Sequence, residues 1–331
     1  MATIYEVSEL AGVSLATVSR VMNNNAKVSE KTRTKVLQAM DELGYRPNSI
    51  AQSLASNRTN SVGVLVSELH GGFFGFIMDG IENELRLANK HIIITTGHSD
   101  EAQEKSAIEF LISRKCDALI LLTDSVPDDY LVSISKTIPT VLVNRKVDEI
   151  AQNCISLNNE HGGYLATKAL INKGHTNIAY IAGPDWKDDS HDRLVGHQRA
   201  LKEHNLPYQT ELFFQGDFNE GSGFDGFNEL HAAPTKFTAI ACGNDEMASG
   251  AMKAARKQGL TLPTDLSIVG FDNNMFASYL YPELTTIDNS AYLMGKMATD
   301  IILKNVYKQD DIAIQNVFEP KLITRNSIAA K

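Results

Sequence analysis

The sequence is poor in cysteine and has no long apolar run. Its three cysteines, Cys116, Cys154 and Cys242, are odd in number, far apart and embedded in apolar segments. This pattern argues against a disulfide framework or a metal cluster and indicates a reducing compartment. No apolar run approaches the roughly 18 residues of a membrane span, and the opening "MATIYEVSEL" has neither a basic leader nor an apolar signal core. We expect a cytoplasmic protein with no membrane segment.

Enzyme signatures are also missing. The sequence has no dinucleotide fingerprint, no phosphate-binding P-loop and no nucleophile elbow, and its nine histidines are scattered. We therefore expect no catalytic residues, no metal and no cofactor. A sugar-transforming enzyme stays as a distant alternative, because Asp272 together with Asn244 is a candidate general base.

The charge is divided unevenly along a chain that is too long for one hydrophobic core. With 331 residues, 43% of them hydrophobic, at least two domains are expected. The net charge of −9 argues against nucleic acid, yet residues 1–58 hold seven Lys or Arg against five Asp or Glu, whereas the remainder holds 24 against 35. The basic part is thus the N-terminal part.

Capping and periodicity predict three short helices near the N-terminus. Thr3 and Glu6 form a capping box, Gly12 and Val13 make a tight corner, Ser14 caps a second helix that runs to about Met22, and Ser29 and Gly44 bound a third. Two apolar stripes are expected to face their shared core: Ile4, Val7, Leu10 and Ala11 in the first helix, and Val36, Leu37, Met40 and Leu43 in the third.

The second helix, "VSLATVSRVM", keeps small polar groups where a core helix would carry leucine. Val18 and Val21 face inward, and the opposite face is short enough to bring the backbone close to base edges. This is helix-turn-helix spacing, although a solvated surface helix fits the same stretch. Residues 45–58, "YRPNSIAQSLASNR", are too few to form a core, so they predict either a hinge that folds on DNA or a plain linker.

Together, "TIYEVSELAGVSLATVSRVMNN", "VSEKTRTKVLQAMDELGYRPN" and "IAQSLAS" resemble the lactose and galactose repressor family of bacterial transcription regulators, with the galactose-type branch the nearest in likeness. The resemblance implies base reading by Leu15, Ala16 and Arg20, phosphate contacts that include Thr17 and Ser19, and a minor-groove wedge at Leu54. Further DNA contacts are expected at Thr3, Ser14, Asn23, Asn48 and Ala51.

From Ser61 onward, short β-branched runs alternate with helical stretches, in two series. They begin with "VGVLVS" and "HIIITTG" and continue after "EHGGYLATKALINKGH" with "IAYIAG" and "FTAIACGND". Such runs indicate strands buried on both faces of two parallel, doubly wound sheets, the layout of periplasmic-binding-protein-like lobes. The resemblance implies these domains: a helix-turn-helix headpiece at 1–46, a hinge at 47–59, a first lobe at 60–159 with 290–318, and a second lobe at 160–289 with 319–331.

Polar residues follow several of these strands and are expected to point into one interlobe cleft: Asn144 and Arg145, Asn244 and Asp245, and Asp272 and Asn273. The resemblance implies effector contacts at Asn144, Arg193, Asn244 and Asp272, a set that suits sugar hydroxyls. Phe74 is a candidate for stacking on a sugar ring. Trp186, Asp189 and His191 are candidates for the cleft mouth, with a surface position as the alternative. Each of these residues also has an ordinary structural reading as a turn former, a helix cap or a core aromatic.

These features predict a homodimeric repressor that binds a pseudo-palindromic double-stranded operator and leaves it when a sugar, galactose or a related saccharide, enters the cleft. An effector that strengthens DNA binding, such as a purine-like corepressor, remains the alternative. The dimer contact is expected on the first helix of the first lobe, at Ile77, Ile81 and Leu85, unless these face their own sheet. No leucine heptads follow "FEPKLITRNS", so a dimer rather than a tetramer is expected.

Overall fold

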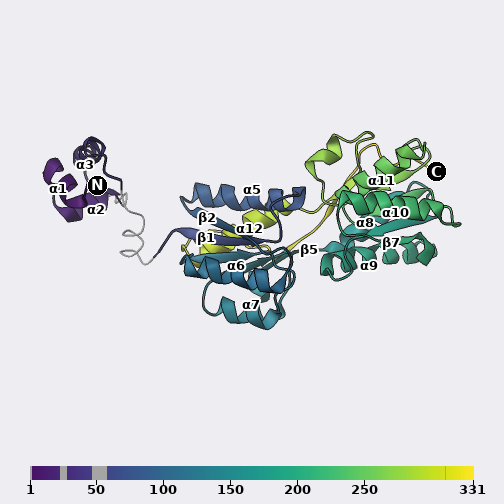
Figure 1. Ribbon diagram of the computed structural model, residues 1–331, viewed down its shortest axis with the longest axis horizontal. Coiled ribbons are helices and arrows are strands. Elements are labelled where there is room, and N and C mark those ends of the chain that lie inside the picture. Colours follow the sequence, from purple (N-terminus) through teal and green to yellow (C-terminus); the bar gives the residue numbers. More distant parts are fainter. Residues whose placement is uncertain (1, 23–27, 47–57, 310) are drawn as a thin grey trace. The chain divides into compact units, whose positions relative to one another are not determined.

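A computed structural model describes residues 2–22, 28–46, 58–309 and 311–331. The chain divides into two compact units, residues 1–59 and residues 60–331. Each unit has a hydrophobic core of its own, and Figure 1 shows the elements of both.

The first unit is a bundle of three short helices: α1 (Ile4–Ala11), α2 (Leu15–Met22) and α3 (Glu30–Glu42). The predicted capping box is confirmed, because the Glu6 backbone N–H donates to Thr3 Oγ1 at 3.4 Å and the Thr3 N–H donates to Glu6 Oε2 at 2.7 Å. Gly12 adopts a φ of +64°, as the tight turn into α2 requires. The core consists of Val7, Ala11, Val18, Val21, Val36 and Ala39.

Two leucines predicted to lie in this core are exposed instead. Leu10 is 47% exposed and Leu37 is 51% exposed, whereas their chain neighbours Ala11 and Val36 are buried. One residue step turns about 100° around a helix, so a core this narrow takes one of two adjacent apolar residues and excludes the other. On α3 the buried residues are Val36 and Ala39.

The second unit begins with a lobe built on a parallel sheet in the order β11-β5-β4-β3-β1-β2. Helices α5 and α12 cover one face of this sheet, and α6 and α7 cover the other (Figure 1). The elements of this lobe are β1 (Ser61–Val66), α5 (Gly72–Leu87), β2 (His91–Thr96), α6 (Glu101–Ser113), β3 (Ala118–Leu121), α7 (Asp128–Ser135), β4 (Thr140–Val143), η1 (Asp148–Asn153), β5 (Cys154–Leu157), α12 (Ala291–Asn305) and β11 (Val317–Phe318).

The second lobe repeats this plan around the parallel sheet β7-β6-β8-β9, and an antiparallel pair of strands, β10 and β12, lies beside it. Its elements are α8 (Asn159–Ile171), β6 (Ile178–Ala182), α9 (Asp188–Glu203), η2 (Thr210–Leu212), β7 (Phe213–Gln215), α10 (Glu220–Ala232), β8 (Ala239–Cys242), α11 (Asp245–Lys257), β9 (Ser267–Val269), η3 (Met275–Ser278), β10 (Thr286–Asp288) and β12 (Lys321–Ile323). The predicted fold class, a helical N-terminal unit followed by two parallel α/β lobes, is confirmed.

The chain passes between the lobes three times. It leaves the first lobe after β5, returns between β10 and α12, and leaves again between β11 and β12. Because all three connections are short, they hold the two sheets next to one another while leaving a space between their carboxyl ends.

Strand β2 departs from the predicted burial on both faces. Its residues are half-buried or exposed, and Ile94 is 41% exposed. The strand stands at the end of the sheet order beside β1, where fewer side chains cover it than cover a central strand.

On α5, the three residues named as a candidate dimer contact face their own sheet, which is the alternative that the sequence left open. Ile77, Ile81 and Leu85 are at most 1% exposed, because they pack between their own sheet and α12. Large exposed apolar side chains occur instead after β9, where Met275, Tyr279 and Tyr281 are 65%, 71% and 86% exposed. Among the described helices, none is long and apolar enough to cross a membrane.

Candidate functional site

The outward face of α2 is the candidate DNA-reading surface of the first unit. Val18 and Val21 point into the core, as predicted, while Ala16, Ser19 and Arg20 are exposed and Leu15 and Thr17 are half-buried. Ser14 caps the helix, because its Oγ accepts the Thr17 backbone N–H at 3.2 Å. The face that α2 leaves open therefore ends in small side chains and one guanidinium.

The remaining predicted DNA contacts divide into two groups. The Thr3 hydroxyl is engaged in the α1 capping box, where it lies 2.9 Å from Glu6 Oε2. Ser14 likewise shares its hydroxyl with Thr17 Oγ1 at 2.9 Å. Asn23, Asn48, Ala51 and Leu54 lie outside the described residues.

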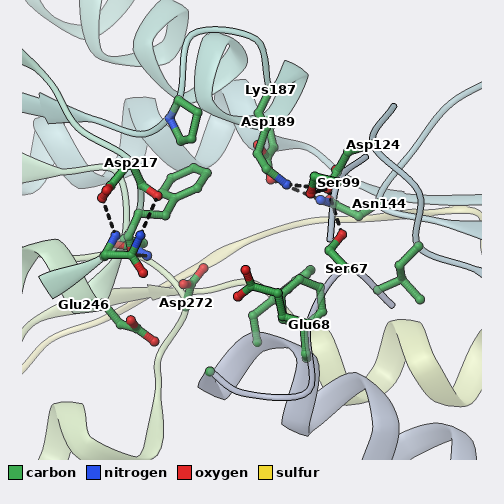
Figure 2. Close-up of a pocket in the computed structure, with 18 of the residues that line it drawn as sticks. Ser67, Glu68, Ser99, Asp124, Asn144, Lys187, Asp189, Asp217, Glu246 and Asp272 are labelled. Atoms are coloured by element: carbon green, nitrogen blue, oxygen red, sulfur yellow. Dashed lines mark hydrogen bonds and ion pairs between the residues drawn. The ribbon is translucent and has the colours of Figure 1, made fainter. Parts of the chain in front are cut away.

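The second unit contains a cavity of about 320 Å³ between its lobes. The cavity is lined by residues that follow the strands of both sheets, which is where doubly wound sheets bind ligands. All six predicted effector contacts line it: Phe74, Asn144, Asp189, Arg193, Asn244 and Asp272. Figure 2 shows the cavity, with Asp272 and Glu246 on the side opposite Asn144 and Asp124.

Arg193, on α9, is the central buried cation of the cavity, with 5% of its side chain exposed. Its Nε donates to Asn159 Oδ1 at 3.0 Å, and its Nη1 donates to the Gly243 carbonyl at 2.7 Å. The guanidinium also stacks on the Phe271 ring, 3.8 Å from the ring centroid. These contacts fix the guanidinium, so the carboxylates around it can be oriented toward a ligand.

Asp189 and Asp272 lie on opposite sides of this guanidinium. Asp189 Oδ2 is 3.8 Å from Arg193 Nη2, and Asp272 Oδ1 is 3.7 Å from Arg193 Nη1. Burial raises the pKa of Asp272 to about 7, the negative charge of Asp189 adds to this, and Arg193 opposes it. Beneath them, burial and the charge of Asp272 hold the pKa of Asp245 well above its usual range. The second lobe thus presents one carboxyl group, that of Asp272, whose pKa lies near neutral pH.

Two polar contacts join the lobes across the cavity. Asn144, after β4, donates from Nδ2 to Asp189 Oδ2 at 3.1 Å. Lys187, before α9, donates from Nζ to Asp124 Oδ2 at 2.8 Å, and the same oxygen accepts the hydroxyls of Ser67 and Ser99 at 2.8 and 2.6 Å (Figure 2). Burial alone would raise the pKa of Asp124, but Lys187 and the serine hydroxyls outweigh it and the pKa lies below its usual range.

Asn244 has a structural role as well as a place in the cavity wall. It is the N-cap of α11, since its Oδ1 accepts the Met247 N–H at 2.9 Å, and its Nδ2 donates to the Phe218 carbonyl at 2.7 Å. The alternative reading of this residue as a helix cap is therefore correct in part. Phe74 meets Phe73 edge to face, with the ring centroids 5.4 Å apart, and both rings line the cavity.

Three residues predicted to face the cleft are not part of the cavity lining and bond elsewhere. Arg145 donates to Asp128 at 2.6 Å on the surface, Asp245 accepts the Asn274 N–H at 2.7 Å below the cavity, and Asn273 accepts from Arg325 at 2.7 Å.

Sequence reasoning missed Asp124, Lys187, Ser67 and Ser99. Asp124 and Ser67 follow β3 and β1, so the strand-end rule that selected Asn144 also selects them. Glu104 then explains how Asp124 is placed: this fully buried carboxylate accepts the backbone N–H groups of Asp124, Ser125 and Val126 at 2.9 to 3.0 Å. The loop after β3 is thereby fixed.

A helix-turn-helix unit followed by two lobes that enclose a polar cavity defines a ligand-responsive DNA-binding regulator. Comparison with known proteins makes this specific. Residues 3–48 match the family model "Bacterial regulatory proteins, lacI family", and residues 167–328 match "Periplasmic binding protein-like domain". The transcriptional regulator GalR of Salmonella typhimurium is 38% identical over 99% of this chain and 96% of its own.

Solved structures agree with this assignment. The lac repressor dimer bound to operator and an anti-inducer is 30% identical, with a TM-score of 0.86 over 99% of both chains. A complex of the regulator CelR with cellobiose is 29% identical, with a TM-score of 0.72 over 99% of this chain and 100% of its own. The chain belongs to the LacI family of bacterial transcription regulators and is a DNA-binding regulator rather than an enzyme.

Proposed function

We propose that the protein is a homodimeric repressor that binds a pseudo-palindromic operator and releases it when a sugar occupies the interlobe cavity. The observation that carries the proposal is the likeness over 99% of both chains to the lac repressor dimer bound to operator. Since operator DNA lies in the bacterial cytoplasm, the proposal places the protein there.

The cavity supports a sugar as the effector. It offers carboxylates, amides and hydroxyls around one fixed guanidinium, and aromatic rings at Phe73 and Phe74 that suit the apolar face of a sugar ring. Asp189 Oδ1 is buried and has no hydrogen-bond partner among the described residues, so it is ready to accept a hydroxyl. The relative CelR was solved with cellobiose.

The dimer is supported by the apolar segment after β9, where Met275, Tyr279 and Tyr281 are exposed on one short stretch. In a two-fold dimer each α2 reads one half-site, so the operator repeats with the same symmetry. In this proposal, residues 47–59 of the two subunits pair as hinges, and Leu54 is a wedge in the minor groove of the operator. A sugar that changes the arrangement of the lobes separates the hinges and removes Leu54 from the groove.

The test is a titration of sugars into the protein bound to a fluorescent symmetric duplex, with a scrambled duplex as control. Release of the symmetric duplex by at least one sugar supports the proposal. Tightening identifies a corepressor instead, and equal affinity for the two duplexes removes the repressor function. Because binding is reciprocal, the operator must weaken sugar binding by the same factor as the sugar weakens operator binding.

Arg20→Ala tests base reading by α2. Loss of one good base contact costs roughly 1 to 3 kcal/mol, so operator affinity is expected to fall about five- to a hundredfold, with little change on random DNA. Lys31→Ala, an exposed position on α3, removes the same charge from the same unit and serves as the control. Equal losses on operator and random DNA would make Arg20 a phosphate contact.

A further inference from the structure

Acidic side chains outnumber basic ones in the lining of the cavity between the lobes. Its lining includes six carboxylates but only two permanent cations, Lys187 and Arg193. The carboxylates belong to Glu68, Asp124, Asp189, Asp217, Glu246 and Asp272. An anion entering this space would meet repulsion that grows as water is displaced, because Coulomb interactions strengthen in a low-dielectric site.

Both cations are already bound by groups of this chain. Lys187 Nζ lies 2.8 Å from Asp124 Oδ2, with both side chains about four-fifths buried. Arg193 uses Nε and Nη1 on Asn159 and the Gly243 carbonyl and lies between Asp189 and Asp272. Binding a phosphate at either cation would first require breaking a buried ion pair and leaving its carboxylate without a neutralising charge, which is costly.

The histidines of the cavity offer no substitute. His70 Nε2 lies 3.0 Å from Glu68 Oε2, and His98 Nε2 lies 3.2 Å from the Thr96 hydroxyl. Each imidazole that lines the cavity therefore has an oxygen partner within the protein.

Helix N-termini usually attract phosphates, but those at this cavity are matched by the protein's own oxygens. Helix α9 carries Asp189 in its first turn, and α11 carries Asp245 and Glu246. Helix α5 has no acidic residue in its first turn. There, Glu246 Oε1 from the other lobe lies 3.6 Å from the position that a Cβ on Gly71 would take.

Two buried acceptor oxygens in the cavity lining have no donor in the part of the chain that the structure describes. Asp189 Oδ1 is buried and unpartnered among the described residues, and Asn274 Oδ1, in the same lining, is in the same state. A sugar hydroxyl can donate to such oxygens, whereas the fully ionised phosphate group that replaces a hydroxyl in a phosphate ester has only acceptors to offer.

We propose that the cavity binds a sugar through its hydroxyl groups and excludes the same sugar once it carries a phosphate. The inference rests on the proposed function, since it names the chemical class of that effector. A regulator built this way responds to the free sugar and is insensitive to the product of the kinase reaction that would consume it.

The first test is calorimetric titration of the full-length protein with paired probes: D-galactose and its 6-phosphate, D-glucose and its 6-phosphate, D-ribose and its 5-phosphate, and inorganic phosphate. For each sugar that binds, the phosphorylated partner is expected to bind at least about 100-fold more weakly, and inorganic phosphate is expected not to bind at millimolar concentration. A phosphate ester that binds as tightly as its parent sugar, or tight binding of inorganic phosphate, overturns this inference but leaves the proposed sugar function standing. Failure of all three free sugars counts against the proposed sugar function, while the inorganic phosphate titration still decides the inference.

The second test releases a cation. Asp124→Asn keeps the shape of the side chain but removes the charge that holds Lys187, so inorganic phosphate binding is expected to become measurable, about tenfold or more above wild type. The double variant Asp124→Asn with Lys187→Met should lose that gain. Asp217→Asn changes the cavity charge equally without releasing a cation, since the Asp217 carboxylate bonds to the Asn219 N–H at 2.8 Å.

A gain in Asp217→Asn as large as that in Asp124→Asn would show that net charge alone excludes phosphate and would overturn the role given to the Lys187–Asp124 pair. Absence of any gain in Asp124→Asn would overturn it as well. The wild-type titrations remain decisive if Asp124→Asn does not fold.

Discussion

The two walls of the cavity are built differently. The second lobe contributes charged groups that are nearly buried and fixed within that lobe: the side chains of Arg193, Asp272 and Asp189 are 5%, 8% and 12% exposed. The first lobe contributes hydroxyls, an amide and two of the six carboxylates, Glu68 and Asp124. Its Asn144 and Asp124 bond directly to second-lobe partners. From this difference we expect the second lobe to hold the ligand and the first lobe to respond to closure of the cavity.

The sharpest way to break this comparison is Arg193→Met. The change leaves Asp189 and Asp272 without their buried cation, so we expect a loss of stability of about 3 to 5 kcal/mol and at least a hundredfold loss of effector affinity. Denaturant unfolding and calorimetry measure the two effects. Arg199→Met, on the same helix but 38% exposed and paired with Glu160, is the control and should cost within about 1 kcal/mol. Similar losses in both variants would contradict the anchoring role of Arg193.

Asp272→Asn tests the electrostatics of the same wall through pH. An aspartate titrates near 3.9 in the unfolded chain but at about 7 here, because of burial. Between these values the folded protein keeps a proton that the unfolded chain has lost, so the contribution of Asp272 to stability is full below about pH 4 and is lost as the pH rises through about 7.

Asparagine does not titrate, and it has the size and branching of aspartate, so the φ of +114° at this position constrains both residues alike. As the pH rises from mildly acidic to mildly alkaline, the free energy of unfolding should therefore fall less in Asp272→Asn than in the wild type. The difference between the two falls is expected to be on the order of a few kcal/mol. Unfolding curves over this pH range measure the difference. Parallel curves for the two proteins would mean that the Asp272 carboxyl is not held protonated by the fold.

The strand ends show how much of this site the sequence could predict. The β-branched runs predicted the strands, and the rule that ligands bind at their carboxyl ends placed Asn144 and Asp272 in the cavity wall. The same rule could not decide direction, because Arg145 and Asn273 adjoin these residues and point away. Direction depends on the register of the last strand residue, which periodicity leaves uncertain by one position.

The contacts between the lobes were harder to predict from the sequence than the strand-end residues. Lys187 belongs to the loop "GPDWKDD", and nothing in that pattern indicates a partner 63 residues earlier in the chain. Similarly, Leu10 and Leu37 are apolar at helical spacing, yet the small three-helix core excludes them. In both cases the outcome depends on how elements distant in sequence pack together, and local periodicity carries no information about that.

Gly72→Ala tests the closing role of the first lobe. Gly72 starts α5, and a Cβ there would overlap the Asn274 side chain of the other lobe, which is 2% exposed and has little room to move. We expect effector affinity to fall about five- to tenfold without loss of stability, because the methyl group acts only when the lobes meet. Gly75→Ala, one turn along the same helix, has nothing within 4 Å of the added Cβ and should leave affinity unchanged. Equal effector affinities for the two variants would mean that the lobes do not close at the contact between Gly72 and Asn274.

The smallest expected effect belongs to Asn144→Gly, which removes the amide that donates to Asp189 while keeping a residue suited to the φ of +60°. One hydrogen bond of this kind contributes about 1 kcal/mol, so affinity should fall roughly three- to fivefold. Stability should change less, because the bond joins the lobes and adds nothing within either one. Calorimetry against the same sugar used for Arg193→Met gives the comparison directly. A loss as large as that of Arg193→Met would mean that the first lobe also anchors the ligand, and that the two walls of the cavity do not differ in this role.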